Sequence, residues 1–572
     1  MDGDIALVEA AMSSRCFYRL VDIGVPFPHN RFGEYVGYKT DHDPRQRATS
    51  AGPLTSKIMT EKLGDQVKQK NITVFDGYQA VAVLTDREKK RSLGLLALNL
   101  NQLNDPDERY AIFNCTNIIY GTGGPAGMYS ASVYPESQTG STGIAFEAGV
   151  RGKNLTESQY GIASVKFRWN LSGTYQQVLP RYISANQDGS DEREFLIDYF
   201  PDPGRMLDAV FLKGYQWPFD ARKIAGYGSS LIDILVYRET VIKGRRVFLD
   251  YTRNPAVLEG NPLKFHLLSK ESHTYLENSN ALFGTPIERL KHMNQPAVDL
   301  YRSHGIDLEN EYLEIAVCAQ HNNGGLAGNI WWESNIRHFF PVGEVNGSHG
   351  VYRPGGSALN SGQVGSTRAA QFIAAKYSSA PLDTENFISE TLSQLEVKIG
   401  IGEALLKDTG SKSNVLEIRK RIGLRTSSAG AHIRSLSAVE KALKDAEADL
   451  SSFMEQTRLS SPNDLPLAYQ NLDLLITQIA YLSAIADYIR HGGKSRGSYL
   501  ISDSKGRLPA EGLEEIFRYT VQDKDMLADK IQEVSYNNGC CTVEWRQVRP
   551  IPAPDEWFEN VWAEYRKGSI IE

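Results

Sequence analysis

The feature that most constrains this chain is the concentration of glycine, histidine and arginine between residues 318 and 370. The stretch holds the glycine pairs Gly324-Gly325 and Gly355-Gly356, three histidines, and an arginine in a glycine-rich turn. Glycine lets a backbone come close to a ligand, or adopt positive φ, where a Cβ would clash. Histidine and arginine offer donors to anions. This density exceeds what turns need, so we expect a ligand site here; the alternative is a set of surface loops.

Size and composition indicate an ordinary globular protein. The 572 residues, 41% hydrophobic and 23% charged, are enough for about two to four domains. A net charge of −7 gives no reason to expect nucleic acid or an acidic membrane surface as a partner. We expect no membrane span, because no run of about 18 apolar residues is present. The first residues also lack the regions of a signal peptide.

The cysteines point to a reducing compartment. Five cysteines in this length form neither a disulfide framework nor a metal or iron–sulfur spacing. Free thiols, no metal site and a cytoplasmic location are therefore expected.

Hydrophobic patterns predict several elements. Residues 5–24 have helical spacing, 72–84 and 93–100 are typical of a strand pair, and 111–124 of a buried strand that runs into a glycine turn. Farther on, residues 465–491 carry one apolar helical stripe, and Gly492 is a candidate C-cap.

The run from residue 339 to 370, FFPVGEVNGSHGVYRPGGSALNSGQVGSTRAA, carries a resemblance. It resembles the C-terminal flavin-binding segment of the fumarate reductase and succinate dehydrogenase flavoprotein family. That family also includes L-aspartate oxidase and the flavoprotein subunit of adenylylsulfate reductase. Its pattern is a strand into GE, then HG, an arginine, and G-x-S-x-L opening a helix. The resemblance implies FAD as cofactor.

The resemblance also implies an α/β fold, in which an α+β capping domain is inserted into a Rossmann-like FAD-binding domain and a helical domain follows. The expected units are 1–168 and 313–378 for the FAD-binding domain, 169–312 for the capping domain, 379–500 for the helical domain and 501–572 for a C-terminal element.

The expected FAD-binding domain is incomplete. Flavoproteins of this kind begin with a strand, G-x-G-x-x-G and a helix whose N-terminus holds the FAD pyrophosphate. No such fingerprint occurs here. We expect the chain to start after its ADP-binding unit, because of a late start of the reading frame, a unit supplied in trans, or loss of firm FAD binding; the first is favoured. Missing a central strand predicts weak FAD affinity and poor stability.

The resemblance assigns cofactor contacts to three short segments. The first is a TGG turn after the buried strand, the second a glutamate that binds the ribityl chain, and the third the turn beside the isoalloxazine ring. The matching residues are Thr122, Gly123, Gly124, Gly343, Glu344, Gly355, Gly356, Ser357, Ala358 and Leu359. Residues 139–149 resemble the family's TGDG…EAG loop and helix, although the acidic residue is missing.

The resemblance also assigns substrate contacts. His321 matches a histidine that meets the substrate, and Arg353 matches the arginine that binds its carboxylate, a pairing that suits bidentate geometry. The alternatives are a strand-capping histidine and an arginine paired with a glutamate. In the capping domain Arg181 is kept, but the position of the proton-shuttling arginine is occupied by Gly226. Two nearby residues are candidate replacements, Arg222 and Tyr227.

These observations favour an FAD-dependent oxidoreductase of fumarate reductase flavoprotein type, in which hydride passes between flavin N5 and a small anionic substrate. One alternative is a flavoprotein subunit that transfers electrons with an iron–sulfur partner. Another is a truncated, non-catalytic paralogue. The substrate, the electron donor and the oligomeric state stay open.

Overall fold

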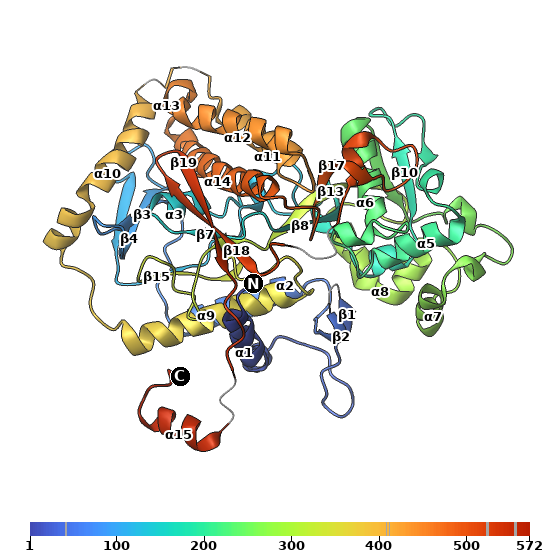
Figure 1. Ribbon diagram of the computed structural model, residues 1–572, viewed down its shortest axis with the longest axis horizontal. Helices are drawn as coiled ribbons and strands as arrows, with labels where there is room; N and C mark the ends of the chain where they lie inside the picture. The colour runs from blue at the N-terminus through green and yellow to red at the C-terminus, as the bar shows by residue number, and fades with distance from the viewer. Residues whose placement is uncertain (41–42, 408, 411, 522–525, 554–556, 572) are drawn as a thin grey trace.

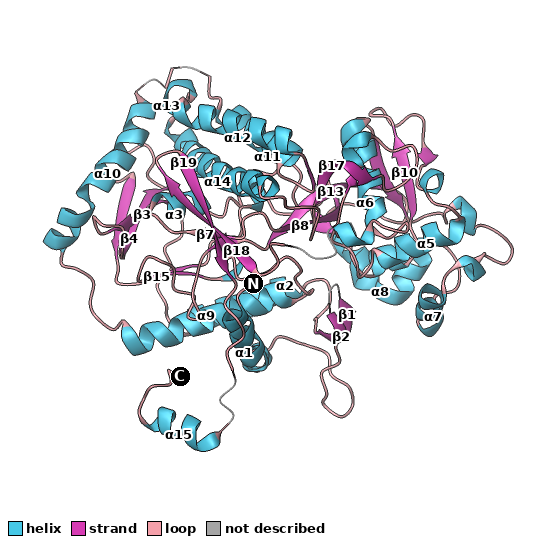
Figure 2. Cartoon of the chain, viewed as in Figure 1, coloured by secondary structure: helices cyan, strands magenta, loops and turns pink. Residues whose placement is uncertain are grey.

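The computed structural model of the chain describes residues 1–40, 43–407, 409–410, 412–521, 526–553 and 557–571. The chain forms two lobes joined by a sheet, with helices packed around the strands of each lobe (Figures 1 and 2). The larger lobe contains both termini, and the smaller lobe is built mainly from the middle of the chain (Figure 1).

A short parallel strand pair lies at the centre of the larger lobe. The strands are β6 (Ile118–Tyr120) and β15 (Phe339–Pro341), with Ile119 opposite Phe340. Both are apolar, as strands of a buried parallel sheet are. After β15 the chain turns into α9 (Ser357–Lys376), against which α1 (Gly3–Asp22) packs.

Other elements extend this lobe. An antiparallel sheet is formed by β3 (Tyr78–Thr85), β4 (Ser92–Asn99) and β5 (Tyr110–Asn114). A hairpin and a helix lie near α1, namely β1 (Tyr38–Thr40), β2 (Asp43–Ala48) and α2 (Thr55–Gln69). A short helix, α3 (Thr142–Glu147), follows β6.

A six-stranded antiparallel sheet connects the two lobes. Its order is β11 (Arg193–Glu194), β10 (Arg181–Ala185), β12 (Arg246–Asp250), β13 (Leu313–Asn322), β8 (Ser158–Ser164) and β9 (Trp169–Asn170). The first three residues of β13 pair with β12, and the strand from Ile315 onward pairs with β8. The predicted boundaries at 168–169 and 312–313 therefore fall within one continuous sheet.

The helices of the smaller lobe close over its side of this sheet. They are α4 (Thr174–Gln177), α5 (Pro203–Leu212), α6 (Ser230–Tyr237), α7 (Lys270–Asn278) and α8 (Pro286–Ser303). Leu231, Ile234 and Leu235 of α6 are fully buried in one core with Val247 and Leu249 of β12.

Five helices pack on the side of the larger lobe that lies away from α1 and α9 (Figure 1). They are α10 (Thr384–Leu406), α11 (Val415–Ala429), α12 (Leu436–Ser451), α13 (Phe453–Gln456) and α14 (Leu465–Arg490). The predicted helix over 465–491 is α14, which ends at Arg490 before the left-handed Gly492. With its preceding turn α14 is long and apolar enough to cross a membrane, but 83% of its apolar window is buried inside the protein.

The C-terminal segment, which the sequence did not assign, contributes to both lobes. The hairpin of β18 (Lys530–Asn537) and β19 (Cys540–Gln547) joins β7 (Gly152–Lys153) and β14 (Gly325–Leu326) in one sheet. Upstream, β17 (Leu500–Arg507) pairs with β16 (Ile433–Arg434), and Leu500 lies in the core of the smaller lobe. The last helix, α15 (Phe558–Arg566), projects from the body with no buried residue (Figure 1).

Candidate functional site

A cavity of about 610 Å³ lies at the N-terminal end of α9. Its walls come from α1, the hairpin segment 43–49, the loop 349–356 and the first two turns of α9. The cavity lies beside the part of the sequence singled out for its glycines. It is large enough to hold a ring system of several fused rings.

The start of α9 is built to face a ligand. Gly356 precedes the helix with φ of +81°, a conformation that favours glycine, and Ser357 Oγ donates to the Pro354 carbonyl at 2.8 Å. The first N–H groups of a helix have no partner inside the helix, and they carry the positive end of its dipole. Leu359, in this first turn, lines the cavity and is 43% exposed.

The second wall carries a buried cation. Arg353 is 6% exposed and lines the cavity, with Nη1 donating to the Pro354 carbonyl at 3.1 Å and Nη2 donating to Gln159 Oε1. Gln159 lies on β8 directly opposite His321 on β13. The two strands therefore bring Gln159 and His321 together next to the arginine.

Two buried imidazoles stand close to Arg353. The rings of His321 and His349 are 5.2 Å apart, and His349 lines the cavity. His321 Nδ1 lies 3.1 Å from Asn323 Oδ1, and its Nε2 has no hydrogen-bond partner among the described residues. Burial, followed by the charge of Arg353, lowers the pKa of His349 to about 3 and that of His321 well below its usual range. Both rings are therefore neutral near pH 7, and Arg353 supplies the positive charge.

The predicted TGG turn and the predicted glutamate come together at the carboxyl ends of β6 and β15. A Cβ on Gly124 would lie 2.7 Å from Glu344 Oε1, so only glycine fits beside that carboxyl group. Glu344 accepts hydrogen bonds from Tyr134 Oη and from the Asn322 amide, both at 2.8 Å. Gly343 has φ of +73° and touches α9 at Gly362.

The other residues of the turn are placed as follows. The Thr122 carbonyl accepts a hydrogen bond from Gln138 Nε2 at 2.8 Å, and Gly123 has φ of +75°. Gly355 packs on Thr40, because a Cβ there would lie 2.6 Å from the threonine Cβ. Ala358 is in the first turn of α9. In open α/β sheets ligands bind beyond the carboxyl ends of the strands, where the turns at 122–124 and 343–344 lie. The cavity itself is lined by Gly355, Gly356, Ser357 and Leu359, and not by the residues of those two turns.

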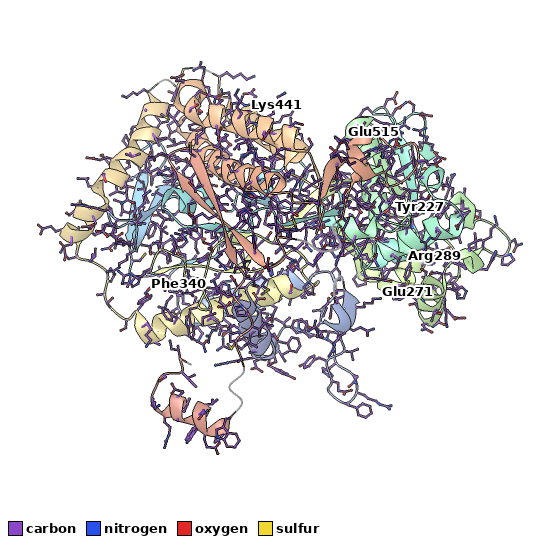
Figure 3. The ribbon with its side chains drawn as sticks, in the orientation of Figure 1. Tyr227, Glu271, Arg289, Phe340, Lys441 and Glu515 are labelled. Atoms are coloured by element: carbon purple, nitrogen blue, oxygen red, sulfur yellow. The ribbon has the colours of Figure 1, made fainter. Side chains whose placement is uncertain are left out.

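The predicted residues of the smaller lobe are not brought to the cavity wall. Arg181 forms ion pairs with Glu194 at 2.8 Å and Asp250 at 3.3 Å within the sheet. Tyr227 packs at 6.3 Å from Phe200, and Figure 3 shows it in the smaller lobe, far from Phe340 of β15. These two side chains serve the fold of that lobe.

Arg222 does not line the cavity but packs on Tyr352, which does. Its guanidinium pairs with Asp220 at 2.8 Å and stacks 3.5 Å above the ring of Tyr352, which lines the cavity. Arg222 therefore contacts the wall from outside and joins the smaller lobe to it.

Sequence reasoning missed residues that come from distant segments. Gln159 lies in no recognisable motif. It could have been found only from the pairing of its strand with the strand that bears His321. Asp473 of α14 is another such residue, because its Oδ1 accepts a hydrogen bond from the Ile144 amide at 2.9 Å at the start of α3. Burial raises the pKa of Asp473 to about 7.

The described ranges offer no candidate metal site. They contain no group of three or more histidine, cysteine, aspartate or glutamate side chains that could hold a metal ion.

Comparisons with known proteins bear on the family and the fold. No family model matches the chain. Over 66 residues, 11% of this chain and 12% of the relative, it is 41% identical to one subunit of the fumarate reductase (CoM/CoB) of Methanothermobacter marburgensis. Over 344 residues, 59% of this chain and 53% of the relative, it is 22% identical to L-aspartate oxidase 2 of Ralstonia nicotianae. The chain thus spans about half the length of this oxidase and less of the reductase.

The fold is also found among solved structures. A quinol-fumarate reductase determined with menaquinol molecules superposes with a TM-score of 0.67 at 17% sequence identity. The match covers 96% of this chain and 86% of that chain. With the sequence matches, it confirms the resemblance to the flavoprotein family and its arrangement of helices and sheets.

Proposed function

Because this chain resembles the fumarate reductase and succinate dehydrogenase flavoproteins in sequence and has their fold, we propose that it is an FAD-dependent oxidoreductase acting on a small anionic substrate. The observation that carries the proposal is one cavity bounded by both the positive end of α9 and the buried guanidinium of Arg353.

The residues present fit the flavin ring. Gly355 and Gly356 line the cavity without side chains, and the positive N-terminal end of α9 beside them would favour negative charge on a bound ring. Glu344, held by Tyr134 and Asn322, would meet the ribityl hydroxyls. No G-x-G-x-x-G occurs in the sequence, so the fit concerns the isoalloxazine half of FAD. When bound, the flavin supplies hydride at N5.

The chain's own residues would then bind and orient the substrate. Arg353 offers a charge-assisted hydrogen bond to a carboxylate in a buried setting, where such bonds are strong. Gln159 Oε1 accepts a hydrogen bond from Arg353 Nη2, and this fixes the plane of the guanidinium group. His321 is neutral and its Nδ1–H donates to Asn323 Oδ1, so its Nε2 is an acceptor that could take a hydrogen bond from a substrate hydroxyl or from water.

The test is reconstitution of the full chain with FAD, reduction by dithionite, and re-oxidation by a panel of enoates, dicarboxylates and oxyanions, followed by flavin absorbance. We expect an anionic compound to re-oxidise the flavin in the wild type. Re-oxidation by none of the panel, or an Arg353→Ala variant as fast as the wild type, would contradict the proposal.

A protein partner is part of the proposal. The methanogen relative is by name one subunit of its reductase, and an electron-transfer partner, such as an iron–sulfur protein, would supply the electrons. Co-purification of a redox protein with the tagged chain from its own organism tests this point.

A further inference from the structure

A glutamate from α1 lies in the wall of the same cavity. Glu9 is 8% exposed and lines the cavity. Its Oε1 accepts a hydrogen bond from Ser361 Oγ of α9 at 2.7 Å, and Ser361 Oγ lies 3.0 Å from Ser348 Oγ. Three buried polar side chains from three separate segments therefore meet at the cavity.

This carboxyl group is buried. The cation whose charge acts on it is Lys153, and the Nζ of that lysine lies 3.7 Å from Asp2 Oδ2. Burial raises the pKa of Glu9, and the hydroxyls of Ser361 and Ser348, then the charge of Lys153, oppose the rise. A carboxyl group in such a setting tends to keep its proton.

The other carboxyl group on the wall and its imidazole are poor proton donors near neutral pH. Asp43 is held as a carboxylate, because the Arg47 amide and guanidinium donate to it at 2.6 and 3.0 Å and its pKa is lowered. His349 is neutral, and Arg353 is the cation proposed to bind the substrate anion.

We propose that Glu9 is the proton donor of this site. The inference rests on the proposed function, because reduction of a carbon–carbon double bond needs an acid as well as a hydride. The family's arginine position is occupied by Gly226, while Arg222 is engaged by Asp220 and Tyr352. Glu9 and Asp43 are the two carboxyl groups among the described residues of the wall, and Asp43 is held as a carboxylate by Arg47.

The step balances for an enoate. Hydride from reduced flavin bonds to one alkene carbon, the π bond breaks, and the proton of Glu9 bonds to the other carbon. The flavin is oxidised by two electrons and the alkene is reduced by two. The Glu9 carboxylate that is left accepts a hydrogen bond from Ser361, whose Oγ lies 3.0 Å from Ser348 Oγ, and regains a proton from water.

The first experiment compares Glu9→Gln with the wild type, each as the full chain loaded with FAD and reduced. Glutamine keeps the volume and the hydrogen bond but has no acidic proton. We expect re-oxidation by fumarate to slow about 100-fold, the low end of the range for general acids, while re-oxidation by ferricyanide, which needs no proton on carbon, is unchanged. The matched control is Glu61→Gln on α2, an exposed glutamate.

The second readout uses the cofactor-free chain. Infrared difference spectra across a pH titration should show a protonated carboxyl band that is lost in Glu9→Gln and kept in Glu61→Gln. In the loaded wild type the fumarate rate should fall as pH rises through the Glu9 pKa, and that dependence should vanish in Glu9→Gln.

The outcomes separate the two claims. Equal fumarate rates in wild type and Glu9→Gln, a parallel loss with ferricyanide, or no Glu9 carboxyl band would overturn the inference and leave the proposed function standing. A wild type that binds no flavin would overturn the proposed function and the role of Glu9 with it.

Discussion

The turns predicted to hold flavin and the smaller lobe differ in where the structure places their predicted residues. The turns around Gly124, Gly343 and Gly356 gather at the carboxyl ends of β6 and β15 and at the start of α9. In the smaller lobe, Arg181 and Tyr227 are used by the lobe's own packing. The glycine turns can be placed from the sequence because few residues other than glycine fit their backbone conformation. The position of a long side chain such as Arg181 depends on its neighbours in the fold, which the sequence does not show.

The largest effect on stability is expected from Arg181. Removing it in Arg181→Ala leaves Asp250, which is fully buried, without its cation. Loss of one partner of a buried pair costs about 3 kcal/mol, so the unfolding midpoint in urea should fall markedly. Affinity for fumarate, measured on the folded protein, should not change. A loss of affinity with unchanged stability would place Arg181 in the site. It would contradict the difference drawn here between the glycine turns and the smaller lobe.

Arg353 should behave in the opposite way. A hydrogen bond from a charged group contributes about 1.5–3 kcal/mol, so Arg353→Ala should weaken fumarate binding by about 10- to 100-fold. Arg353→Lys keeps the positive charge but not the paired N–H donors of the guanidinium group, so it should recover part of the affinity. Calorimetric titration measures both. Unchanged affinity in the alanine variant would remove Arg353 from the site.

The glycine turn can be tested with a matched pair. Gly356→Ala forces alanine into φ of +81° and should cost about 1–2 kcal/mol of unfolding free energy. Gly362→Ala lies inside α9, where the nearest atom to a new Cβ is 3.6 Å away, and should be neutral or stabilising by up to about 1 kcal/mol. Similar denaturant midpoints for the two variants would show that the turn is not constrained.

The neutral imidazoles predict a dependence of stability on pH. The folded-state pKa of His349 is about 3, below its unfolded value of about 6.5, so the unfolded state binds more protons between these values. Stability is therefore lost as pH falls below about 6.5, by about 1 kcal/mol from pH 6.5 to 5.5 for this residue.

His349→Asn should flatten that part of the curve, while the exposed His29→Asn should not. Urea unfolding at several pH values gives the measurement. A His349→Asn curve parallel to the wild type would show that a protonated imidazole is tolerated in the cavity wall.

Much of the fold could be predicted from local patterns. The apolar stripe of 465–491 is α14, and the strand predicted over 72–84 is β3, although β3 starts only at Tyr78. Residues 5–24 correspond to α1, which begins at Gly3 and ends at Asp22. These elements follow from periodicity, which is a local property of the chain.

The remainder depends on contacts between distant segments. Gln159 meets Arg353 only because β8 pairs with β13 in one register. Glu9 reaches the cavity because α1 packs on α9, and Asp473 caps α3 from a helix more than 300 residues away. No periodicity carries such information, because side-chain partners are fixed by tertiary packing.

The most direct measurement of the central claim is a flavin fluorescence titration of the full chain with FMN, which carries the ring without the ADP half. The wild type should quench FMN with saturation at one flavin per chain, and FAD should bind with similar affinity. Leu359→Trp, which adds bulk at a half-exposed position on the cavity wall, should abolish quenching while leaving the unfolding midpoint unchanged. Saturable binding that survives in Leu359→Trp, or no binding in the wild type, would contradict a flavin at the start of α9.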